Sequence, residues 1–407
     1  MQFRLREKTP PLSVAAWRTL ARKRLPDMAW HYLEGGADDH ITIDENLRGF
    51  TRWRLRQRSL RGVSQPKLAA NIAGEHLALP LALAPTGAAG FCHWQADVAA
   101  SRAAENAGIR AVLSTAASYS LEEVAEATRN NHWFQLYPFG DRAKVAALMA
   151  RARAAGYTAL FVTVDVPTLG NRESERANGM GQPRTLTPAR LLNMLCHPRW
   201  LYGLLRYRRI AAVHYLERDA NSPVNTPERI RKVLMGGADD AIASADAQAR
   251  YMQSDLTWDD LAWMREQWPG KFYVKGILDP EDAARAVDDI GADGVLVSNH
   301  GGRQLDRCLA SIDALPAIAA RIGDRAEVYL DGGVRRGSDV ITALCLGAKG
   351  VFIGRPYLYG LAGGGEEGVA GVLDVFASEI RRTLILMGCT DVQDLDKSWL
   401  IDLSHTE

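Results

Sequence analysis

A short run in the last third of the chain combines residue types suited to proton transfer with residue types suited to anion binding. Residues 298–306 read SNHGGRQLD, so His300 is followed by two glycines and then by Arg303. Imidazole titrates near neutral pH and can act as a general base. A guanidinium binds a carboxylate through two parallel hydrogen bonds. The two glycines allow a tight turn, so the histidine and the arginine are expected to lie close together at the carboxyl end of the strand that precedes them.

The elements that must position this run are visible as a repeating pattern. It follows a continuous apolar segment of the kind found in strands buried on both faces. Most of these segments precede an Ala-, Leu- and Arg-rich stretch at helical spacing. The predicted strands are Leu81 to Ala84, Ala111 to Thr115, Trp133 to Tyr137, Ala159 to Asp165, Phe272 to Gly276, Gly294 to Ser298, Glu327 to Asp331 and Gly350 to Gly354.

Eight βα units predict a closed (β/α)8 TIM barrel of the α/β class. An open doubly wound sheet is the alternative, but such sheets more often have about five to seven strands. We expect one domain over residues 1–407. Residues 1–60 are expected to form helices that cover the barrel's amino-terminal part and supply Tyr32.

Nearly every predicted strand ends in a polar or charged residue. In this barrel the carboxyl ends of the strands carry function. An unpaired buried polar group costs about 1 to 3 kcal/mol, so these groups are expected to converge on a shared polar ligand. They are Thr86, Ser114, Gln135, Tyr137, Thr163, Asp165, Lys275, His300, Asp331, Gly354 and Arg355.

The last two strands indicate a phosphate on that ligand. DGGVRRG at residues 331–337 and IGRP at residues 353–356 both bring glycine and arginine after a strand. Glycine lets backbone N–H groups approach phosphate oxygens, and the final loops of this barrel commonly bind phosphate. Lys275 is placed to stabilise a developing anion, and no metal-ligand cluster is visible in the sequence. These features favour redox chemistry on a phosphate-bearing cofactor.

Taken together, these motifs resemble the FMN-dependent 2-hydroxy-acid dehydrogenase and oxidase family over nearly the whole chain. Glycolate oxidase, flavin-type L-lactate dehydrogenase and (S)-mandelate dehydrogenase belong to that family. Two further runs, YLEGGADD and CHPRW, look most like the mandelate enzyme. The motifs that carry the resemblance are SNHGGRQLD, APTG, WFQLY, TVDVPTLGNRE, VKGILDPEDA, DGGVRRGSDV and IGRP.

The resemblance implies an enzyme that uses FMN to oxidise an (S)-2-hydroxy acid to the 2-keto acid. It implies that His300 is the base and that Asp165 orients it and stabilises its charged form. Whether the first proton leaves carbon or oxygen stays open. The residues implied at the cofactor are Thr86, Gly87, Ser114, Gln135, Thr163, Lys275, Asp331, Gly332 and Gly333, with Arg335, Gly354 and Arg355 at its phosphate.

The resemblance also assigns the substrate's contacts. Arg172 and Arg303 match the arginines that hold the substrate carboxylate, and Tyr32 and Tyr137 match tyrosines that bind its carboxylate and hydroxyl. Ala116 stands where glycolate oxidase has a tryptophan, which frees space for a larger side chain. Gly87 replaces an alanine of the oxidases and matches the mandelate enzyme. A bulky or aromatic 2-hydroxy acid is therefore expected.

The chain between the fourth and fifth strands predicts an insertion over residues 176–255. Arg176 to Leu216 has seven arginines and no acidic residue, interleaved with Leu, Trp and Tyr. This composition is typical of a segment at a membrane interface. A solvated lid or oligomer contact is an alternative, and so is binding of single-stranded nucleic acid. In membrane-bound members of the family this loop is the anchor and a quinone is the acceptor. The arginines are Arg176, Arg184, Arg190, Arg199, Arg206, Arg208 and Arg209. The polar stretch that follows, from Glu217 to about Asp255, predicts a mobile loop.

Composition narrows the remaining possibilities. The net charge of +1 gives no general attraction to nucleic acid, and the five cysteines show no CxxC pair. We expect reduced thiols, no structural metal, no signal peptide and no membrane-spanning run. The protein is therefore expected to be cytoplasmic. If the insertion binds a membrane, the protein would lie at the inner face of that membrane. The family resemblance implies a homotetramer.

Several functions stay open at this stage. The favoured function is a dehydrogenase that reduces a quinone. The alternatives are a soluble oxidase that reduces O2 to H2O2 and a lactate dehydrogenase of the same family. An FMN isomerase would not need the paired arginines Arg172 and Arg303 beside His300. A flavin-binding protein without activity would not need an intact base and clamp. The short region before the first strand offers no room for a haem domain.

Overall fold

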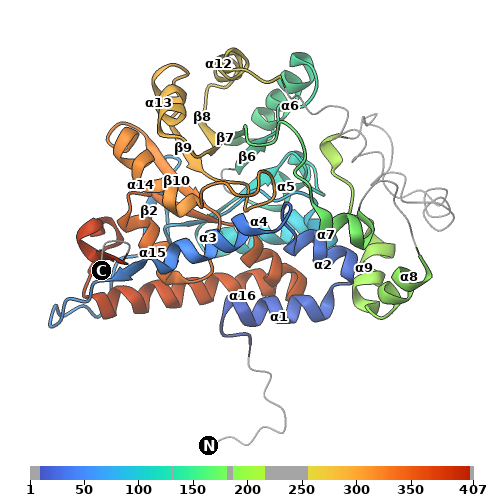
Figure 1. Cartoon of the computed structure of the whole chain (residues 1–407). Helices are drawn as coiled ribbons and strands as arrows, with labels where there is room; N and C mark the ends of the chain where they lie inside the picture. Colours follow the sequence, from blue (N-terminus) through green and yellow to red (C-terminus); the bar gives the residue numbers. More distant parts are fainter. Residues whose placement is uncertain (1–9, 130–131, 181–186, 216–254, 404–407) are drawn as a thin grey trace, which may run out of the picture.

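Eight parallel strands close into a barrel at the centre of the molecule (Figure 1). The computed structural model describes residues 10–129, 132–180, 187–215 and 255–403. The strands lie in the order β10-β11-β4-β5-β6-β7-β8-β9, with β9 paired to β10. All eight predicted strands are present, so the predicted barrel is confirmed. They are β4 (Leu81–Leu83), β5 (Arg110–Ser114), β6 (His132–Leu136), β7 (Tyr157–Thr163), β8 (Lys271–Ile277), β9 (Gly294–Val297), β10 (Glu327–Asp331) and β11 (Gly350–Ile353).

Helices follow the strands and surround the barrel. Side chains that accept hydrogen bonds from the first turn fix where several of them begin: Ser120 caps α5, Asp141 caps α6 and Asp279 caps α13. The last helix, α16, changes direction at Gly364 and Gly365. The helices are α4 (Ala96–Asn106), α5 (Leu121–Ala127), α6 (Arg142–Ala154), α12 (Trp258–Gln267), α13 (Pro280–Asp288), α14 (Ser311–Ile322), α15 (Gly337–Cys345) and α16 (Arg355–Met387).

Large side chains fill the inside of the barrel. Trp133, Phe161, Tyr273, Tyr329 and Phe352 are completely buried in one cluster, as expected for a barrel that is a packed core rather than a pore. The hairpin of β2 (Ala70–Ile72) and β3 (Glu75–Leu77) contributes buried residues to the same cluster. Its backbone is tied to the barrel where the N–H of residue 73 donates to the hydroxyl of Tyr329 at 2.7 Å. The amino-terminal end of the barrel is therefore closed.

The helices before the barrel do not lie where the sequence analysis placed them. They are α1 (Val14–Arg24), α2 (Asp27–Glu34) and α3 (Ile41–Thr51). The side chain of Asn46 in α3 exchanges two hydrogen bonds of 2.8 Å with Asn299, just after β9, and α2 carries Tyr32 into the pocket at the carboxyl ends of the strands. The expectation of a cover at the barrel's amino-terminal part is wrong for α2 and α3, because amphipathic patterns do not specify which end of a barrel a helix covers.

The insertion after β7 forms a helical projection beside the barrel (Figure 1). Trp200 and Gly203 bury the inner side of α9, and the Trp200 indole donates to the carbonyl of Phe91 at 2.7 Å. Arg184, Leu216 and residues 217–254 lie outside the described residues. The elements are α7 (Glu173–Glu175), η2 (Arg176–Met180), α8 (Pro188–Leu195), α9 (Pro198–Tyr207) and η3 (Val213–Tyr215). Across the described parts of the chain, no helix is both long and apolar enough to cross a membrane.

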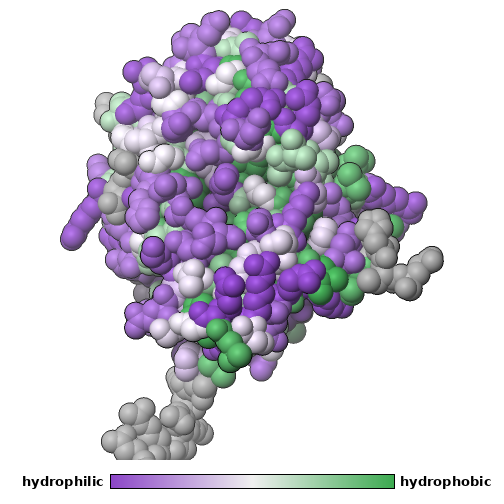
Figure 2. Space-filling model, turned by 90° about the vertical axis from the view of Figure 1, so that its left-hand side faces the viewer, coloured by the Kyte–Doolittle hydropathy of each residue, from purple (hydrophilic) through white to green (hydrophobic). Residues whose placement is uncertain are grey.

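The chain ends on the side of the barrel that carries α14 and α15 (Figure 1). There β12 (Leu400–Asp402) pairs antiparallel with β1 (Trp53–Leu55), after the short turns η4 (Val392–Asp394) and η5 (Lys397–Trp399). Another short turn, η1 (Ala89–Phe91), follows β4. The surface on this side is mainly hydrophilic, with apolar residues scattered among polar ones (Figure 2).

Candidate active site

A pocket opens at the carboxyl ends of the barrel strands and gathers most of the residues predicted from the sequence. Ser114, Ala116, Asp165 and Arg172 are not in its lining, but each contacts the lining or lies directly behind it. The predicted residues that do line it are Tyr32, Thr86, Gly87, Gln135, Tyr137, Thr163, Lys275, His300, Arg303, Asp331, Gly332, Gly333, Arg335, Gly354 and Arg355.

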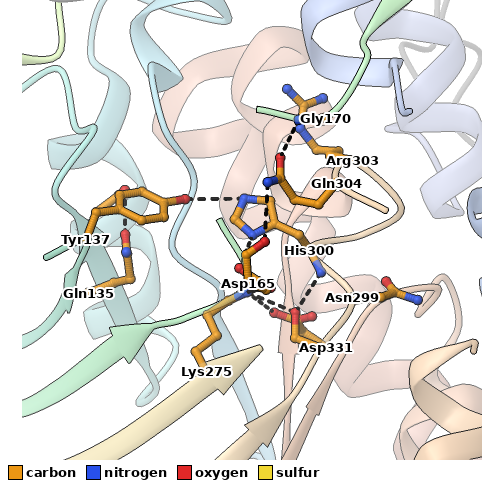
Figure 3. Close-up of polar contacts among 12 residues, drawn as sticks. Gln135, Tyr137, Asp165, Gly170, Lys275, Asn299, His300, Arg303, Gln304 and Asp331 are labelled. Atoms are coloured by element: carbon orange, nitrogen blue, oxygen red, sulfur yellow. Dashed lines mark hydrogen bonds and ion pairs between the residues drawn. The ribbon is translucent and has the colours of Figure 1, made fainter. Parts of the chain in front are cut away.

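His300 lies between a carboxylate and a phenol (Figure 3). Its Nδ1 is 2.8 Å from Asp165 Oδ1, and its Nε2 is 3.2 Å from the hydroxyl of Tyr137. A carboxylate only accepts hydrogen bonds, so Nδ1 carries the proton and Nε2 keeps its lone pair. That lone pair accepts the hydrogen bond from the Tyr137 hydroxyl, and both residues line the pocket. An unprotonated nitrogen at the pocket is what a general base requires.

Burial lowers the pKa of His300 below its ordinary value, although Asp165 partly offsets this effect. Burial would raise the pKa of Asp165, but His300 and Lys275 outweigh it and the pKa of this carboxyl is lowered. The pair therefore rests as neutral imidazole beside carboxylate at neutral pH. A proton taken up at Nε2 would be stabilised by the charge of Asp165.

The backbone at His300 is held in an unusual conformation. Its φ is +57°, and Gly301 and Gly302 follow with φ of +64° and +73°. The left-handed region costs a residue with a Cβ about 1 to 2 kcal/mol, and Ser298 helps to hold it, since its Oγ accepts the His300 N–H at 3.0 Å. These three residues turn the chain sharply after β9, as the two glycines predicted. Such strain is typical of functional sites.

A buried cation lies below the base. Lys275 Nζ is 3.3 Å from Asp331 Oδ2 and 3.9 Å from Asp165 Oδ2, and it donates to Ser298 Oγ at 2.9 Å (Figure 3). Burial would lower the pKa of Lys275, but the two carboxylates outweigh it and raise the pKa above its ordinary value. The ammonium group therefore stays charged and places a fixed positive charge at the floor of the pocket.

The two predicted substrate arginines share a carboxylate that the sequence analysis did not identify. Arg303 Nη2 is 2.8 Å from Glu175 Oε1, in a contact not aligned as a hydrogen bond, and Arg172 Nη1 is 3.9 Å from Glu175 Oε2. Arg303 also donates to the carbonyls of Tyr32 and Gly35, at 2.8 and 2.9 Å. Glu175 is 7% exposed, so it partly neutralises two buried cations that would otherwise repel each other.

Gln304 joins these groups to the loop after β7 that carries Asp165. Its Oε1 accepts a hydrogen bond of 2.9 Å from Arg172 Nη2, and its Nε2 donates to the carbonyls of Asp165 and Thr168 at 3.2 and 2.6 Å. Together with Ser298 and Glu175, Gln304 is a residue that the sequence analysis missed. Its place next to Arg303 in the SNHGGRQLD run was the only available signal.

One wall of the pocket is formed by small residues beside Tyr32. The Tyr32 hydroxyl donates to the carbonyl of Gly87 at 3.1 Å. A Cβ added at Gly87 would lie 2.9 Å from Ala116 Cβ and 3.5 Å from the Tyr32 hydroxyl. Gly87 and Ala116 therefore pack closely against each other, and a larger residue at position 87 would displace Ala116 or Tyr32.

The donors and acceptors of the pocket match a polar cofactor. Gln135 Nε2, Thr163 Oγ1 and Asp331 Oδ1 are buried and have no hydrogen-bond partner among the described residues. They come from β6, β7 and β10, and all three residues line the pocket. Unpaired buried polar atoms are rare in native proteins and point to a missing ligand. An isoalloxazine ring, with carbonyl oxygens and ring nitrogens along one edge, could pair with such a set.

The arginine after the last strand contacts the backbone as well as the pocket. Arg355 donates to the carbonyls of Leu33, Gly301 and Gly35, at 3.1, 2.8 and 2.8 Å. An arginine has five N–H donors, so two N–H groups of Arg355 remain for a ligand. Burial lowers its pKa to about 10, which still leaves it charged at neutral pH. It joins α2 to the turn after His300 and faces the pocket at the start of α16.

Known proteins share this architecture along almost the full chain. The sequence model for FMN-dependent dehydrogenases matches residues 21–402. The chain belongs to this family. The L-lactate oxidase of Nostoc sp. is 41% identical over 96% of this chain and 98% of that protein. The (S)-mandelate dehydrogenase of Pseudomonas putida is 37% identical over 95% of this chain and 93% of that protein.

A solved structure agrees with these relatives. The crystal structure of the monotopic membrane protein (S)-mandelate dehydrogenase superposes with a TM-score of 0.88 at 36% identity, and covers 97% of this chain and 100% of that one. As a member of the FMN-dependent dehydrogenases, the chain is an FMN-dependent enzyme of 2-hydroxy-acid oxidation. The fit of the unpaired polar atoms to a flavin is therefore in line with the family's cofactor.

Proposed function

We propose that this FMN-dependent dehydrogenase oxidises a bulky or aromatic (S)-2-hydroxy acid to its 2-keto acid and passes the electrons to a membrane quinone. The observation that carries the chemistry is the neutral His300, with its Nε2 unprotonated beside the Tyr137 hydroxyl and its Nδ1 on Asp165 at 2.8 Å. Arg303 lines the same pocket, so a base and an anion clamp serve one ligand.

In the proposed reaction each side chain has one task. Arg303 and Arg172 hold the substrate carboxylate, and Tyr32 and Tyr137 orient the substrate through their hydroxyls. His300 Nε2 takes a proton from the substrate, and Asp165 stabilises the imidazolium that forms. FMN, when bound, would supply the acceptor for the two electrons and for the second hydrogen that leaves the substrate. Lys275 offsets the negative charge that this transfer creates.

The other predicted residues would hold the cofactor. Thr86, Gly87, Ser114, Gln135 and Thr163 would contact the ring system, in agreement with the unpaired atoms of Gln135 and Thr163. α16 begins directly after Gly354, and the positive end of its helix dipole favours an anion there. Asp331, Gly332 and Gly333 are also proposed to contact the cofactor. The residues proposed at its phosphate are Arg335, Gly354 and Arg355.

The size of the substrate is inferred from the two small residues beside Tyr32. Gly87 lines the pocket and Ala116 packs behind it, and a tryptophan at position 116 would take up volume beside the substrate's side chain. The similarity to an (S)-mandelate dehydrogenase supports an aromatic acid. The 41% identity to an L-lactate oxidase supports a second candidate, a lactate-oxidising enzyme that reduces O2.

An anaerobic mixing experiment tests this proposal. The purified yellow protein would be mixed with (S)-mandelate, (S)-4-hydroxymandelate, L-lactate, a long-chain 2-hydroxy acid and glycolate, and the flavin absorbance followed before and after air is admitted. Faster bleaching by the two aromatic acids, with slow recovery in air, is the expected result. Preferential bleaching by lactate with rapid recovery would favour the second candidate, and no bleaching by any acid would refute both.

The proposal of a quinone as the electron acceptor rests on the exposed side of the insertion, because a membrane quinone requires contact with the membrane. Leu191, Leu192 and Leu195 of α8 are 45%, 63% and 55% exposed, and Tyr202 and Leu205 of α9 are 63% and 42% exposed. The side chains of Arg199 and Arg206 are also exposed on α9. An apolar surface with nearby cations is suited to the headgroup region of an anionic membrane. Arg209 is not counted among these exposed cations, because it forms an ion pair with Glu123 at 2.8 Å.

The double variant Leu192→Glu/Leu195→Glu is expected to lose most of its binding to vesicles that contain anionic lipid. The substitutions place two charges where apolar side chains would be buried among lipid headgroups. Co-sedimentation of the variant and of the parent protein measures the effect. Leu386→Glu is the control, because Leu386 on α16 is 59% exposed. Equal sedimentation of the double variant and the parent would contradict the membrane proposal.

We also propose that the protein is a cytoplasmic tetramer that lies peripherally at the inner face of the membrane.

A further inference from the structure

The insertion ends in a tyrosine whose hydroxyl is buried without a partner. Tyr215 is 7% exposed, and its hydroxyl has no hydrogen-bond partner within the described parts of the chain. A buried hydroxyl without a hydrogen bond destabilises the folded protein, because it has lost its hydrogen bonds to water. None of the tasks assigned above to the active-site residues uses this group, so its position calls for another explanation.

Tyr215 lies at the end of a row of aromatic rings that begins at the base. The Tyr137 ring stacks on Phe139 with ring centroids 5.0 Å apart, and Phe139 stacks on Tyr215 at 5.8 Å. The hydroxyl of Tyr137 is 3.2 Å from His300 Nε2. Tyr215 also shares a small buried cluster with Ala116, the residue that packs behind Gly87 in the pocket wall. This row and that wall therefore meet at Tyr215.

The position of Tyr215 is fixed by the same loop that carries Ala116. The N–H of Val213 donates to the carbonyl of Ala117 at 3.0 Å. The neighbouring His214 donates from Nδ1 to the carbonyl of Thr115 at 3.1 Å, and its Nε2 accepts the N–H of Leu121 at 3.2 Å. Both ring nitrogens are thus engaged in the neutral state, and burial lowers the pKa of His214 to about 4. His214 therefore acts as a neutral connector at physiological pH.

The Tyr215 hydroxyl keeps its proton and can donate a hydrogen bond. Burial raises its pKa well above the ordinary value, and the nearby phenols of Tyr137 and Tyr32 add to the effect. Those two phenols are assigned to the carboxylate and hydroxyl of the substrate. A substrate held there would leave its side chain free to extend along the wall of Gly87 and Ala116, toward Tyr215.

We propose that the Tyr215 hydroxyl binds a polar group at the far end of the substrate's side chain, so that the preferred substrate is an aromatic 2-hydroxy acid with a ring hydroxyl. This inference rests on the proposed function and narrows its substrate class. A hydrogen bond to the ring hydroxyl would satisfy the buried group that the protein itself leaves unpaired.

The test compares three acids of similar shape with the holoenzyme. (S)-Mandelate, (S)-4-hydroxymandelate and (S)-4-methylmandelate differ only at the far end of the ring, and the methyl group matches the hydroxyl in size without forming hydrogen bonds. The anaerobic rate of flavin reduction divided by the half-saturating concentration is measured for each. The parent enzyme is expected to favour the hydroxyl over the methyl compound by about three- to tenfold, the usual range for one hydrogen bond.

Tyr215→Phe removes one oxygen and keeps the stacking on Phe139. The preference for 4-hydroxymandelate over 4-methylmandelate is expected to disappear in this variant. Tyr119→Phe is the control and should keep the preference, because the Tyr119 hydroxyl donates to the carbonyl of Trp94 at 3.1 Å, outside the aromatic row. A preference retained in Tyr215→Phe, or absent from the parent enzyme, would overturn the inference while leaving the proposed function intact. If none of the three acids bleached the parent flavin, the proposed aromatic substrate itself would be refuted.

Discussion

His300→Ala is expected to bind FMN and remain yellow, but to be reduced by its substrate more than about a hundredfold more slowly than the parent enzyme. General-base catalysis contributes about 10² to 10⁴ in rate, and the unprotonated Nε2 of His300 is the proposed acceptor of the substrate's proton. Alanine removes that acceptor and leaves the strand ends that would hold the flavin in place. Stopped-flow mixing without oxygen measures the rate of reduction directly.

The control for this variant is His76→Ala. His76 is exposed in the hairpin that closes the other end of the barrel, where it contacts Asn71 at 3.1 Å. The flavin of the His76→Ala variant should be reduced at the same rate as that of the parent enzyme. Near-normal reduction of His300→Ala, with full flavin content, would refute the assignment of His300 as the base. A colourless His300→Ala protein would instead show that His300 supports cofactor binding.

Arg303→Met is expected to raise the half-saturating concentration of a 2-hydroxy acid by about 30-fold or more. Removing one partner of a buried, hydrogen-bonded charge pair costs about 2 to 5 kcal/mol, and about 1.4 kcal/mol corresponds to a factor of ten. Methionine keeps much of the length of the side chain but offers no donor to a carboxylate. The dependence of the anaerobic reduction rate on substrate concentration measures the change.

Two further variants separate substrate binding from structural damage. Arg307→Met alters the same loop, but the Arg307 side chain is 74% exposed, so parent behaviour is expected. Arg303→Met/Glu175→Gln removes the buried carboxylate that the single variant leaves without its closest cation. If the double variant regained parent affinity, the loss in Arg303→Met would come from the unpaired Glu175, and the proposed contact with the substrate would be wrong.

The barrel could be predicted because its strands are buried on both faces. Such strands appear as continuous apolar runs, and the eight runs match the eight strands of the barrel. The parallel order of the strands then places their carboxyl ends at one edge. This is why residues as distant in sequence as Gln135 and Asp331 could be expected in one pocket.

Other parts of the site carry no comparable signal in the sequence. Glu175 lies in a three-residue helical turn after β7, and its sequence context does not reveal that its carboxylate folds back onto Arg303. The side of the barrel that α2 and α3 cover depends on long-range contacts such as that between Asn46 and Asn299. Tyr215 enters the aromatic row only because His214 ties the end of the insertion to the loop after β5.

The closed floor of the barrel has a consequence for the order of events in the catalytic cycle. Trp133, Phe161, Tyr273, Tyr329 and Phe352 leave no passage through the barrel's interior. If the flavin binds above them as proposed, every small molecule must reach it from the carboxyl-terminal side. The acid and the oxidant would then compete for one entrance, and the keto acid would have to leave before electrons move on. We therefore expect the two half-reactions to alternate, as they do in a double-displacement enzyme.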